Sequence, residues 1–217
     1  WGFTEAGEGT FSPEDEREHL FKFWASQINR PVTLVGASLG GATAVDFATA
    51  HPECVRRVVL VDAQGWIDGL GPMSSMPDFF KRAGVNVLKS VPLRQMANKM
   101  AYFDQDKYAT EDAMRIGRLH TYLPGWTDAN VGWMSSGGYR IVNSIPQVSQ
   151  ETLVLWGKQD KILDGSEYAV KYKEAIKKSE LVWVDESGHV PHLEQPSKMT
   201  EHLLEFCAQS QGEPASQ

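Results

Sequence analysis

The sequence has little cysteine, no excess of positive charge and no long apolar run. Only Cys54 and Cys207 occur among its 217 residues, too few for a disulfide scaffold or a zinc site built from thiolates alone. Lys and Arg total 21 against 28 Asp and Glu, a formal net charge of −7 at pH 7. Such an acidic chain is a poor candidate for binding nucleic acid. No run of about 18 apolar residues occurs, so we expect no transmembrane segment.

The chain also lacks an initial methionine and a visible leader. It begins with Trp1, and no basic segment followed by an apolar one comes after it. We therefore expect a processed, trimmed or partial sequence, from which a targeting segment has been lost if there was one. The composition is that of a folded domain, since 41% of the residues are hydrophobic and 23% are charged. The length predicts one domain, or one domain with a large insertion.

Four short apolar runs indicate buried strands, at residues 32–35, 58–61, 153–156 and 181–184. They are rich in Val, Leu and Trp and show no polar alternation, as expected for strands that are covered on both faces. Helical patterns alternate with these strands along the chain. The alternation predicts an α/β fold with a mainly parallel sheet and right-handed crossovers.

The helix signals are clearest near the N-terminus. Ser12 can cap a helix that starts at Pro13. The apolar residues of this predicted helix share one face, namely Leu20, Phe21, Trp24 and Ile28. Further helices are expected directly after Ser38, from about Ser166 and from Ser197.

Residues 64–147 interrupt this alternation with many aromatic residues, methionines, glycines and prolines. A structureless loop of that length would be anomalous. We therefore predict a helical cap, inserted over the strand ends. The resulting division is a core unit at 1–63, the cap at 64–147, a second core unit at 148–208 and a disordered tail at 209–217.

Gly36-Ala37-Ser38-Leu39-Gly40 is the first motif that carries chemistry. It lies between a predicted strand and a predicted helix, where two glycines allow a sharp turn that exposes the serine hydroxyl. The N–H of Leu39, at the start of the helix, can then face a developing oxyanion. The alternative is that Ser38 is a plain helix cap in a glycine-rich turn.

A serine nucleophile needs a base, and the base needs an orienting carboxylate. His189 follows the strand at 181–184, so it is expected at the same edge of the sheet as Ser38. Asp160 follows the strand at 153–156 after a short turn, and we favour it as the carboxylate. Asp62, directly after the strand at 58–61, is its rival, and Asp164 is a weaker third candidate.

The chain order Ser38, Asp160, His189 is that of the α/β-hydrolases. The sequence resembles this superfamily, in the branch that includes plant and plastid-type hydrolases of unassigned substrate. The similar stretches are residues 30–41, 51–53, 58–62, 156–160 and 188–196. Overall the resemblance covers about 1–63 and 150–207 and leaves out the cap. It implies a soluble protein, of the cytosol or the chloroplast.

The chain departs from the family in lacking the strands expected before the nucleophile turn. Residues 1–4 resemble the end of a segment that follows the fourth strand of family members. Two consequences are expected from the missing strands. The strand at 32–35 becomes an unprotected apolar edge, and the oxyanion site keeps only the Leu39 N–H as a donor.

The resemblance implies a serine hydrolase that acts on an ester or related carbonyl substrate. Ser38 attacks, His189 transfers the proton, Asp160 holds the imidazole, and Leu39 N–H supports the oxyanion. The aromatic and Met-rich cap favours an apolar, small-to-medium substrate, the one partner expected. No metal or organic cofactor is implied.

Other functions remain open at this point. The fold also supports receptors that bind ligand without turnover, and lyase or perhydrolase chemistry on the same three residues. The chain as written is also compatible with an inactive fragment of a hydrolase. A serine in the turn argues against haloalkane dehalogenases and epoxide hydrolases, which resemble this fold and carry Asp there.

Overall fold

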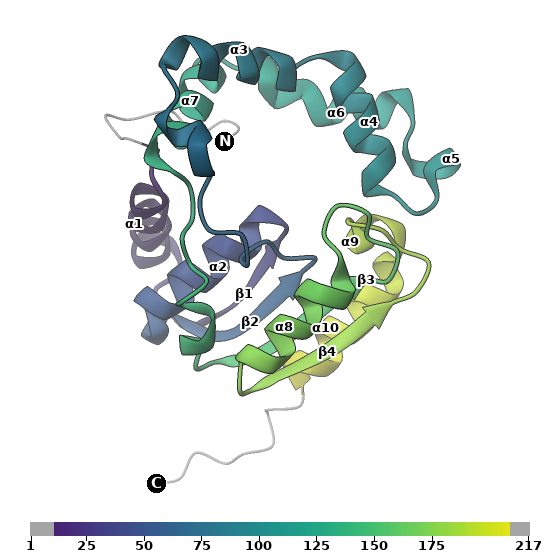
Figure 1. The fold of residues 1–217 in the computed structure, drawn as a ribbon. Coiled ribbons are helices and arrows are strands. Elements are labelled where there is room, and N and C mark those ends of the chain that lie inside the picture. The colour runs from purple at the N-terminus through teal and green to yellow at the C-terminus, as the bar shows by residue number, and fades with distance from the viewer. Residues whose placement is uncertain (1–10, 209–217) are drawn as a thin grey trace, which may run out of the picture.

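A four-stranded parallel sheet forms the centre of the computed structural model, which describes residues 11–208 (Figure 1). Its strands are β1 (Val32–Ala37), β2 (Val55–Val61), β3 (Glu151–Gly157) and β4 (Ser179–Val184). They lie in the order β1-β2-β3-β4, and every neighbouring pair is parallel. The predicted α/β class and all four predicted strands are confirmed. Burial on both faces was expected for all four but holds only for β2 and β3, because β1 and β4 are the outer strands of the described sheet, with Val35 52% and Trp183 38% exposed.

Helices cover both faces of the sheet, which explains why its central strands β2 and β3 show no polar alternation. Successive side chains of a strand point to opposite faces. Val58 and Leu60 accordingly belong to one apolar cluster, together with Tyr172 of helix α8 (Gly165–Ala175). Val59 packs in a second cluster with Phe206 of helix α10 (Pro196–Ala208). Because both clusters are buried, the central strands carry apolar residues at nearly every position.

The predicted helices of the core are present. They are α1 (Pro13–Phe23), α2 (Leu39–Ala50), α8 (Gly165–Ala175) and α10 (Pro196–Ala208), and a short helix, α9 (Pro191–Glu194), precedes α10. Ser12 caps α1 reciprocally with Asp15. The helix does not stay α-helical to Ile28 as predicted, because the turn Trp24–Ile28 is a π-helix. Asn29 closes this wide turn in a left-handed conformation, and its N–H donates to the Trp24 carbonyl.

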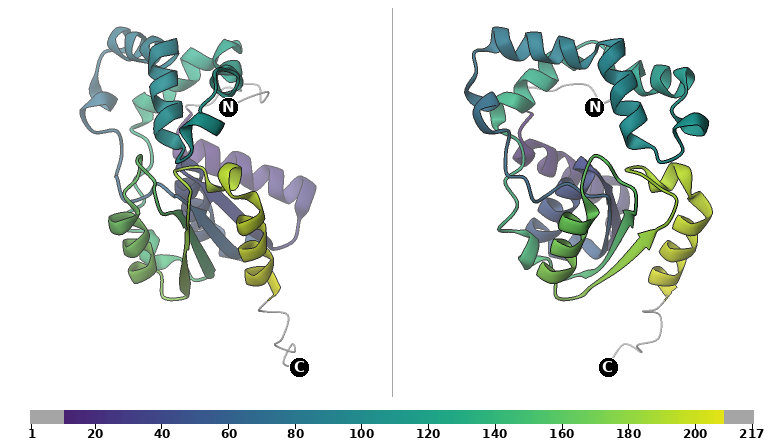
Figure 2. Two further views of the ribbon diagram at one scale, coloured as in Figure 1. Left: turned by 90° about the vertical axis from the view of Figure 1, so that its right-hand side faces the viewer. Right: turned by 45° about the vertical axis from the view of Figure 1, so that its right-hand side comes forward.

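Five α-helices lie between β2 and β3, inside the segment predicted as a cap. They are α3 (Asp78–Leu88), α4 (Val91–Ala101), α5 (Gln105–Tyr108), α6 (Glu111–Arg118) and α7 (Trp126–Ser136). Figure 1 shows them as an arch above the sheet, and Figure 2 shows the same arch from two further directions. The name "cap" is kept for residues 64–147, whose limits stay a prediction.

The cap has a small core of its own, built from Val85, Trp126 and Val131 with Met134 against them. The chain segments that enter and leave the cap are joined by two backbone hydrogen bonds. Gly69 N–H donates to the Tyr139 carbonyl at 2.6 Å, and Leu70 N–H donates to the Gly137 carbonyl at 2.9 Å. The entry and exit of the cap are therefore fixed to each other.

Within the described residues, β1 pairs only with β2 and forms one edge of the sheet. Its Val35 side chain is 52% exposed, so the expected apolar edge is present. Residues 1–4 lie outside the described residues. So do residues 209–217, the tail that was predicted to be disordered. No helix between residues 11 and 208 has the length and apolar character needed to cross a bilayer.

Cys54 and Cys207 are both free thiols. Cys54 is fully buried, and this burial raises the pKa of its thiol to about 11. The thiol therefore stays protonated at neutral pH, which makes it a poor nucleophile and a poor metal ligand.

Candidate active site

Ser38 occupies the sharp turn between β1 and α2. Its backbone has φ 50° and ψ −122°, a conformation that side-chain-bearing residues rarely adopt. The turn requires a glycine at position 36, because a Cβ there would overlap the Gly40 carbonyl and lie 2.9 Å from the Ala44 side chain, whereas a Cβ on Gly40 would meet nothing within 4 Å. Ser38 N–H donates to the Val61 carbonyl at 3.0 Å, which anchors the turn to β2.

The Ser38 side chain makes no capping hydrogen bond to α2. Its Oγ lies 2.9 Å from Nε2 of His189 instead. The alternative that Ser38 is a plain helix cap is therefore wrong for this structure. His189 is 8% exposed, so the contact is largely removed from water.

The second ring nitrogen of His189, Nδ1, lies 2.8 Å from Oδ2 of Asp160. The side chain of Asp160 is fully buried. Its other oxygen, Oδ1, accepts hydrogen bonds from the N–H groups of Ile162 at 2.7 Å and Leu163 at 3.0 Å. The structure thus brings Ser38, His189 and Asp160 into one continuous line of hydrogen bonds.

The two other carboxylates considered from the sequence lie differently. Asp164 caps α8 by accepting a hydrogen bond from the Ser166 N–H at 2.9 Å, and it takes no part in this line. Asp62 is fully buried beside the line, with one oxygen accepting from the Gly157 N–H at 2.9 Å. It is a neighbour of Asp160 and His189 and does not replace Asp160 as the hydrogen-bond partner of His189.

The turn after β3 and the loop after β4 meet backbone to backbone. Gln159 N–H donates to the Ser187 carbonyl at 2.9 Å, and Lys158 N–H donates to the Val184 carbonyl at 3.0 Å. A Cβ on Gly157 would overlap the Gly188 carbonyl and lie 2.8 Å from the Ser187 carbonyl oxygen. Two loops that are distant in sequence thus hold Asp160 and His189 at a fixed separation.

Glu194, on α9, connects the loop that carries His189 to the cap. Its Oε2 accepts a hydrogen bond from the Gly188 N–H at 2.6 Å. Its Oε1 accepts from the N–H groups of Phe103 at 2.9 Å and Asp104 at 3.0 Å, between α4 and α5. Nearby, His189 N–H donates to the Ala101 carbonyl at 2.8 Å. One buried carboxylate therefore joins the cap to the backbone next to His189.

Replacing Glu194 with Gln is expected to destabilise the protein by about 1.5–3 kcal/mol, the range for hydrogen bonds to a charged group. In the wild type both carboxylate oxygens of Glu194 accept from backbone N–H groups. In the glutamine variant one of these oxygens is replaced by an NH₂ group, which cannot accept and which faces another donor. Urea unfolding measures the loss, and hydrogen exchange should accelerate at Phe103, Asp104 and Gly188. Glu201→Gln, on the exposed side of α10, is the matched control. Equal stability of the two variants would contradict the prediction.

From the sequence, Glu194 had no predicted role, and Asp62 was predicted only as the rival of Asp160. Glu194 lies inside the stretch 188–196 used for the family resemblance, and an acidic residue so close in sequence to a candidate histidine was the available signal. Leu39 begins α2 directly after Ser38, and its N–H lies at a helix N-terminus, where such groups lack partners within the helix. Its role at the oxyanion stays a prediction.

Two other histidines pack against aromatic rings. His51 stacks on Phe21 with ring centroids 4.3 Å apart, and His120 packs beside Trp126. Both therefore have a packing role.

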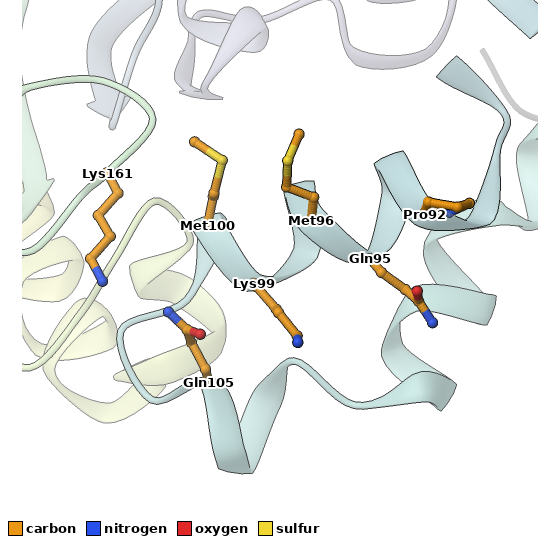
Figure 3. A pocket seen from close by; sticks show the side chains of 7 residues that line it. All are labelled: Pro92, Gln95, Met96, Lys99, Met100, Gln105 and Lys161. Carbon is orange, nitrogen blue, oxygen red and sulfur yellow. The ribbon is translucent and has the colours of Figure 1, made fainter. Parts of the chain in front are cut away.

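A cavity of about 380 Å³ lies between α4, α5 and the turn that carries Asp160 (Figure 3). It is lined by Pro92, Gln95, Met96, Lys99, Met100, Gln105 and Lys161. Figure 3 shows Met96 and Met100 pointing to one side of α4 and Lys99 to the other. Ser38 and His189 do not line this cavity, so it adjoins the candidate site without containing it.

Two groups of side chains within the described residues have metal-ligand atoms within 4.8 Å of one another. One comprises His51, Glu53 and Cys54, where the raised pKa of the Cys54 thiol opposes a thiolate ligand. The other comprises Asp62, Asp160 and His189. There the 2.8 Å separation of His189 and Asp160 is that of a hydrogen bond, shorter than two zinc ligands usually lie. We assign neither group as a metal site.

Comparison with known proteins identifies the family. Residues 1–201 match the model of a family described as "Alpha/beta hydrolase family". The chain belongs to the alpha/beta hydrolase family. The resemblance noted from the sequence is thereby confirmed, and an alpha/beta hydrolase provides the expected setting for a serine in a strand–turn–helix corner.

This alpha/beta hydrolase is similar to the alpha/beta hydrolase domain-containing protein VTE7 of Arabidopsis thaliana. The two are 37% identical over 211 residues, which cover 96% of this chain and 63% of VTE7. It is also 29% identical to a 2-hydroxy-6-oxo-2,4-heptadienoate hydrolase of Pseudomonas putida, over 96% of this chain and 75% of that protein. The chain thus spans less than two thirds of its plant relative.

Solved structures share the fold of this alpha/beta hydrolase at lower sequence identity. An esterase from Exiguobacterium antarcticum superposes with a TM-score of 0.76 at 19% identity, covering 95% of this chain and 77% of the esterase. A meta-cleavage product hydrolase from Pseudomonas fluorescens superposes with a TM-score of 0.74 at 20% identity, covering 95% and 76%. These likenesses establish the fold.

Proposed function

We propose that this alpha/beta hydrolase is a serine hydrolase that cleaves esters or related carbonyl compounds with Ser38 as nucleophile. The observation that carries the proposal is the 2.9 Å contact between Ser38 Oγ and His189 Nε2. Ser38 holds this contact from a strained backbone and makes no capping bond. Strain of this kind is retained where the surrounding structure enforces it, and it is common at active sites.

In the proposed first step, Ser38 Oγ attacks the substrate carbonyl carbon while His189 Nε2 accepts the hydroxyl proton. The carbonyl oxygen becomes an oxyanion, to which Leu39 N–H donates a hydrogen bond. When the tetrahedral intermediate collapses, the bond to the leaving group breaks and His189 returns the proton to it. Water then attacks the acyl-serine with His189 as base, and this step releases the acid and restores Ser38.

Asp160 supports this sequence by accepting a hydrogen bond from His189 Nδ1. That bond fixes the tautomer in which Nε2 is free to take the proton, and it stabilises the imidazolium that results. The N–H groups of Ile162 and Leu163 also donate to Asp160, which holds the carboxylate in place for His189. The energetic benefit is large in a site where His189 is almost fully buried, because few waters screen the pair.

We propose an apolar substrate of small to medium size. Met96 and Met100 are 53% and 40% exposed on α4, and their flexible side chains can adapt to an acyl chain. Relatives of this chain include hydrolases named for 2-hydroxy-6-oxo-dienoic acids and a monoacylglycerol lipase. A substrate panel should therefore contain short and long acyl esters, a monoacylglycerol and a 2-hydroxy-6-oxo-dienoate.

Labelling with a fluorophosphonate, read by intact mass, tests the proposal because such probes modify only activated serines. One adduct is expected on the wild-type chain, and none on Ser38→Ala or His189→Ala. Ser136→Ala, at an exposed serine whose hydroxyl bonds the Trp133 carbonyl, is the matched control and should be labelled like the wild type. A folded wild-type chain without an adduct would contradict the proposal and favour the inactive-fragment alternative.

Product analysis separates the remaining alternatives. Labelling without turnover of any ester, together with saturable ligand binding, would favour a receptor of this fold. Products other than an acid and an alcohol would favour lyase or perhydrolase chemistry. A fluorescent fusion in plant cells tests the predicted location in cytosol or chloroplast.

A further inference from the structure

Asp62 occupies an unusual position directly after β2. Its side chain is fully buried, and its backbone is held in the left-handed region with φ 42°. Its Oδ1 accepts a hydrogen bond from the Gly157 N–H at 2.9 Å. Its Oδ2 is buried and has no donor among the residues that the structure describes. An ionised carboxylate would leave half of its charge unsatisfied there, which is strongly unfavourable in a buried site.

The charged and titratable groups that face Asp62 offer no compensating cation. They are the carboxylates of Asp160, on the turn after β3, and Glu194, on α9, together with the imidazole of His189. The nearest ligand atoms of Asp62, Asp160 and His189 lie within 4.8 Å of one another. Two carboxyl groups this close share a proton more readily than they both ionise.

The surroundings decide which of the two carries the proton. Asp160 receives three hydrogen bonds, from the N–H groups of Ile162 and Leu163 and from His189. Asp62 receives one. The ionised form is therefore stabilised on Asp160 and the neutral form on Asp62. In agreement, burial, with a smaller contribution from the Asp160 charge, raises the pKa of Asp62 to about 9.

We propose that Asp62 is a neutral carboxylic acid at physiological pH, whose Oδ2–H donates a hydrogen bond to Asp160 and positions it for His189. The added donor holds the Asp160 carboxylate in place. The proton also limits the negative charge next to His189 to that of a single Asp. Asp62 is thus a positioning residue that acts through Asp160. Its effect on catalysis rests on the proposed function, whereas its protonation does not.

Protonation of Asp62 predicts that the stability of the folded protein falls as the pH rises. The unfolded chain loses the Asp62 proton near pH 4, whereas the folded chain keeps it up to about pH 9. Between these values the folded state binds more protons, so raising the pH favours unfolding. Relative to Asp62→Asn, which cannot ionise, the wild-type unfolding constant should rise about tenfold per pH unit, or about 1,000-fold from pH 5 to pH 8.

Urea unfolding of wild type and Asp62→Asn at pH 5, 6, 7 and 8 measures this ratio. Asn is close in shape to the neutral acid and can still accept from Gly157 and donate to Asp160. Asp164→Asn is the matched control. Its ratio should stay flat over this range, because hydrogen bonds from Ser166 lower the pKa of Asp164 and Asn also caps helices well. A flat ratio for Asp62→Asn would overturn the proposal.

A second readout tests the hydrogen bond to Asp160. The Nδ1 proton of His189 should give a far-downfield proton NMR signal in wild type and Asp62→Asn. The signal should move upfield or disappear in Asp62→Leu, which has no donor. An identical signal in all three folded proteins would show that Asp62 does not position Asp160. Loss of fluorophosphonate labelling with both readouts intact would contradict the proposed function alone.

Discussion

Replacing His189 with alanine is expected to lower kcat/KM for ester hydrolysis by about 10⁴-fold or more, because Ser38 loses its base. Ser38→Ala should cost at least as much. Both rates are measured with an activated ester, whose leaving group needs little protonation, and with an unactivated ester. The loss in His189→Ala should be smaller for the activated ester, since general-acid assistance to its leaving group is dispensable.

The double variant Ser38→Ala with His189→Ala gives the sharper test. Residues that act as a unit show losses that do not add. The double variant should therefore be no slower than Ser38→Ala alone. A loss equal to the product of the two single losses would show that Ser38 and His189 contribute independently. The 2.9 Å contact would then not describe a nucleophile with its base.

Gly157→Ala is expected to produce a large structural effect for a single added methyl group. The new Cβ would overlap the Gly188 carbonyl and crowd the Ser187 carbonyl at 2.8 Å. Backbone cannot move aside as a flexible side chain can, so we expect a loss of about 3 kcal/mol or more, at the upper end for overpacked sites. Since the displaced loop carries His189, fluorophosphonate labelling should also be lost.

Gly84→Ala provides the matched control. Gly84 lies within α3, and a Cβ there would meet nothing within 4 Å. Alanine costs less conformational entropy than glycine in a helix, so this variant should gain about 0.5–1 kcal/mol. Urea unfolding of both variants gives the comparison. Similar free energies for the two would show that the loop next to Gly157 can yield.

The strands and the serine turn could be predicted because their signals are local. A strand buried on both faces needs an unbroken apolar run, and the turn at Ser38 needs a glycine at position 36. The expectation that Ser38, His189 and Asp160 lie at the same edge of the sheet follows from one rule. In a parallel sheet the carboxyl ends of all strands lie at the same edge. Helix α1 was likewise signalled by Ser12 and Pro13 at its start.

Contacts between distant segments could not be predicted in this way. The role of Glu194 depends on the backbone between α4 and α5, about 90 residues earlier in the chain. Asp62 and Asp160 both follow strands, so the sequence alone offered them as alternatives for one role. In the structure the two side chains lie next to each other, with His189 beside them. The cap helices were not predicted individually, because much of their apolar surface faces outward: Phe79 is 76% exposed and Ile116 is 68% exposed.

The close contacts around Gly188 bear on how this protein can be recombined with its relatives. A Cβ on Gly188 would lie 2.5 Å from the Ala101 carbonyl oxygen and 2.9 Å from the Phe103 nitrogen. The turn that carries Asp160, the loop that carries His189 and the α4–α5 junction therefore have to be exchanged together, as one block. A chimera that exchanges the cap at Leu70 and Tyr139 should fold only if the donor keeps the backbone path that meets Glu194. Exposed positions such as Ile116 and Leu119 should tolerate substitution without disturbing that block.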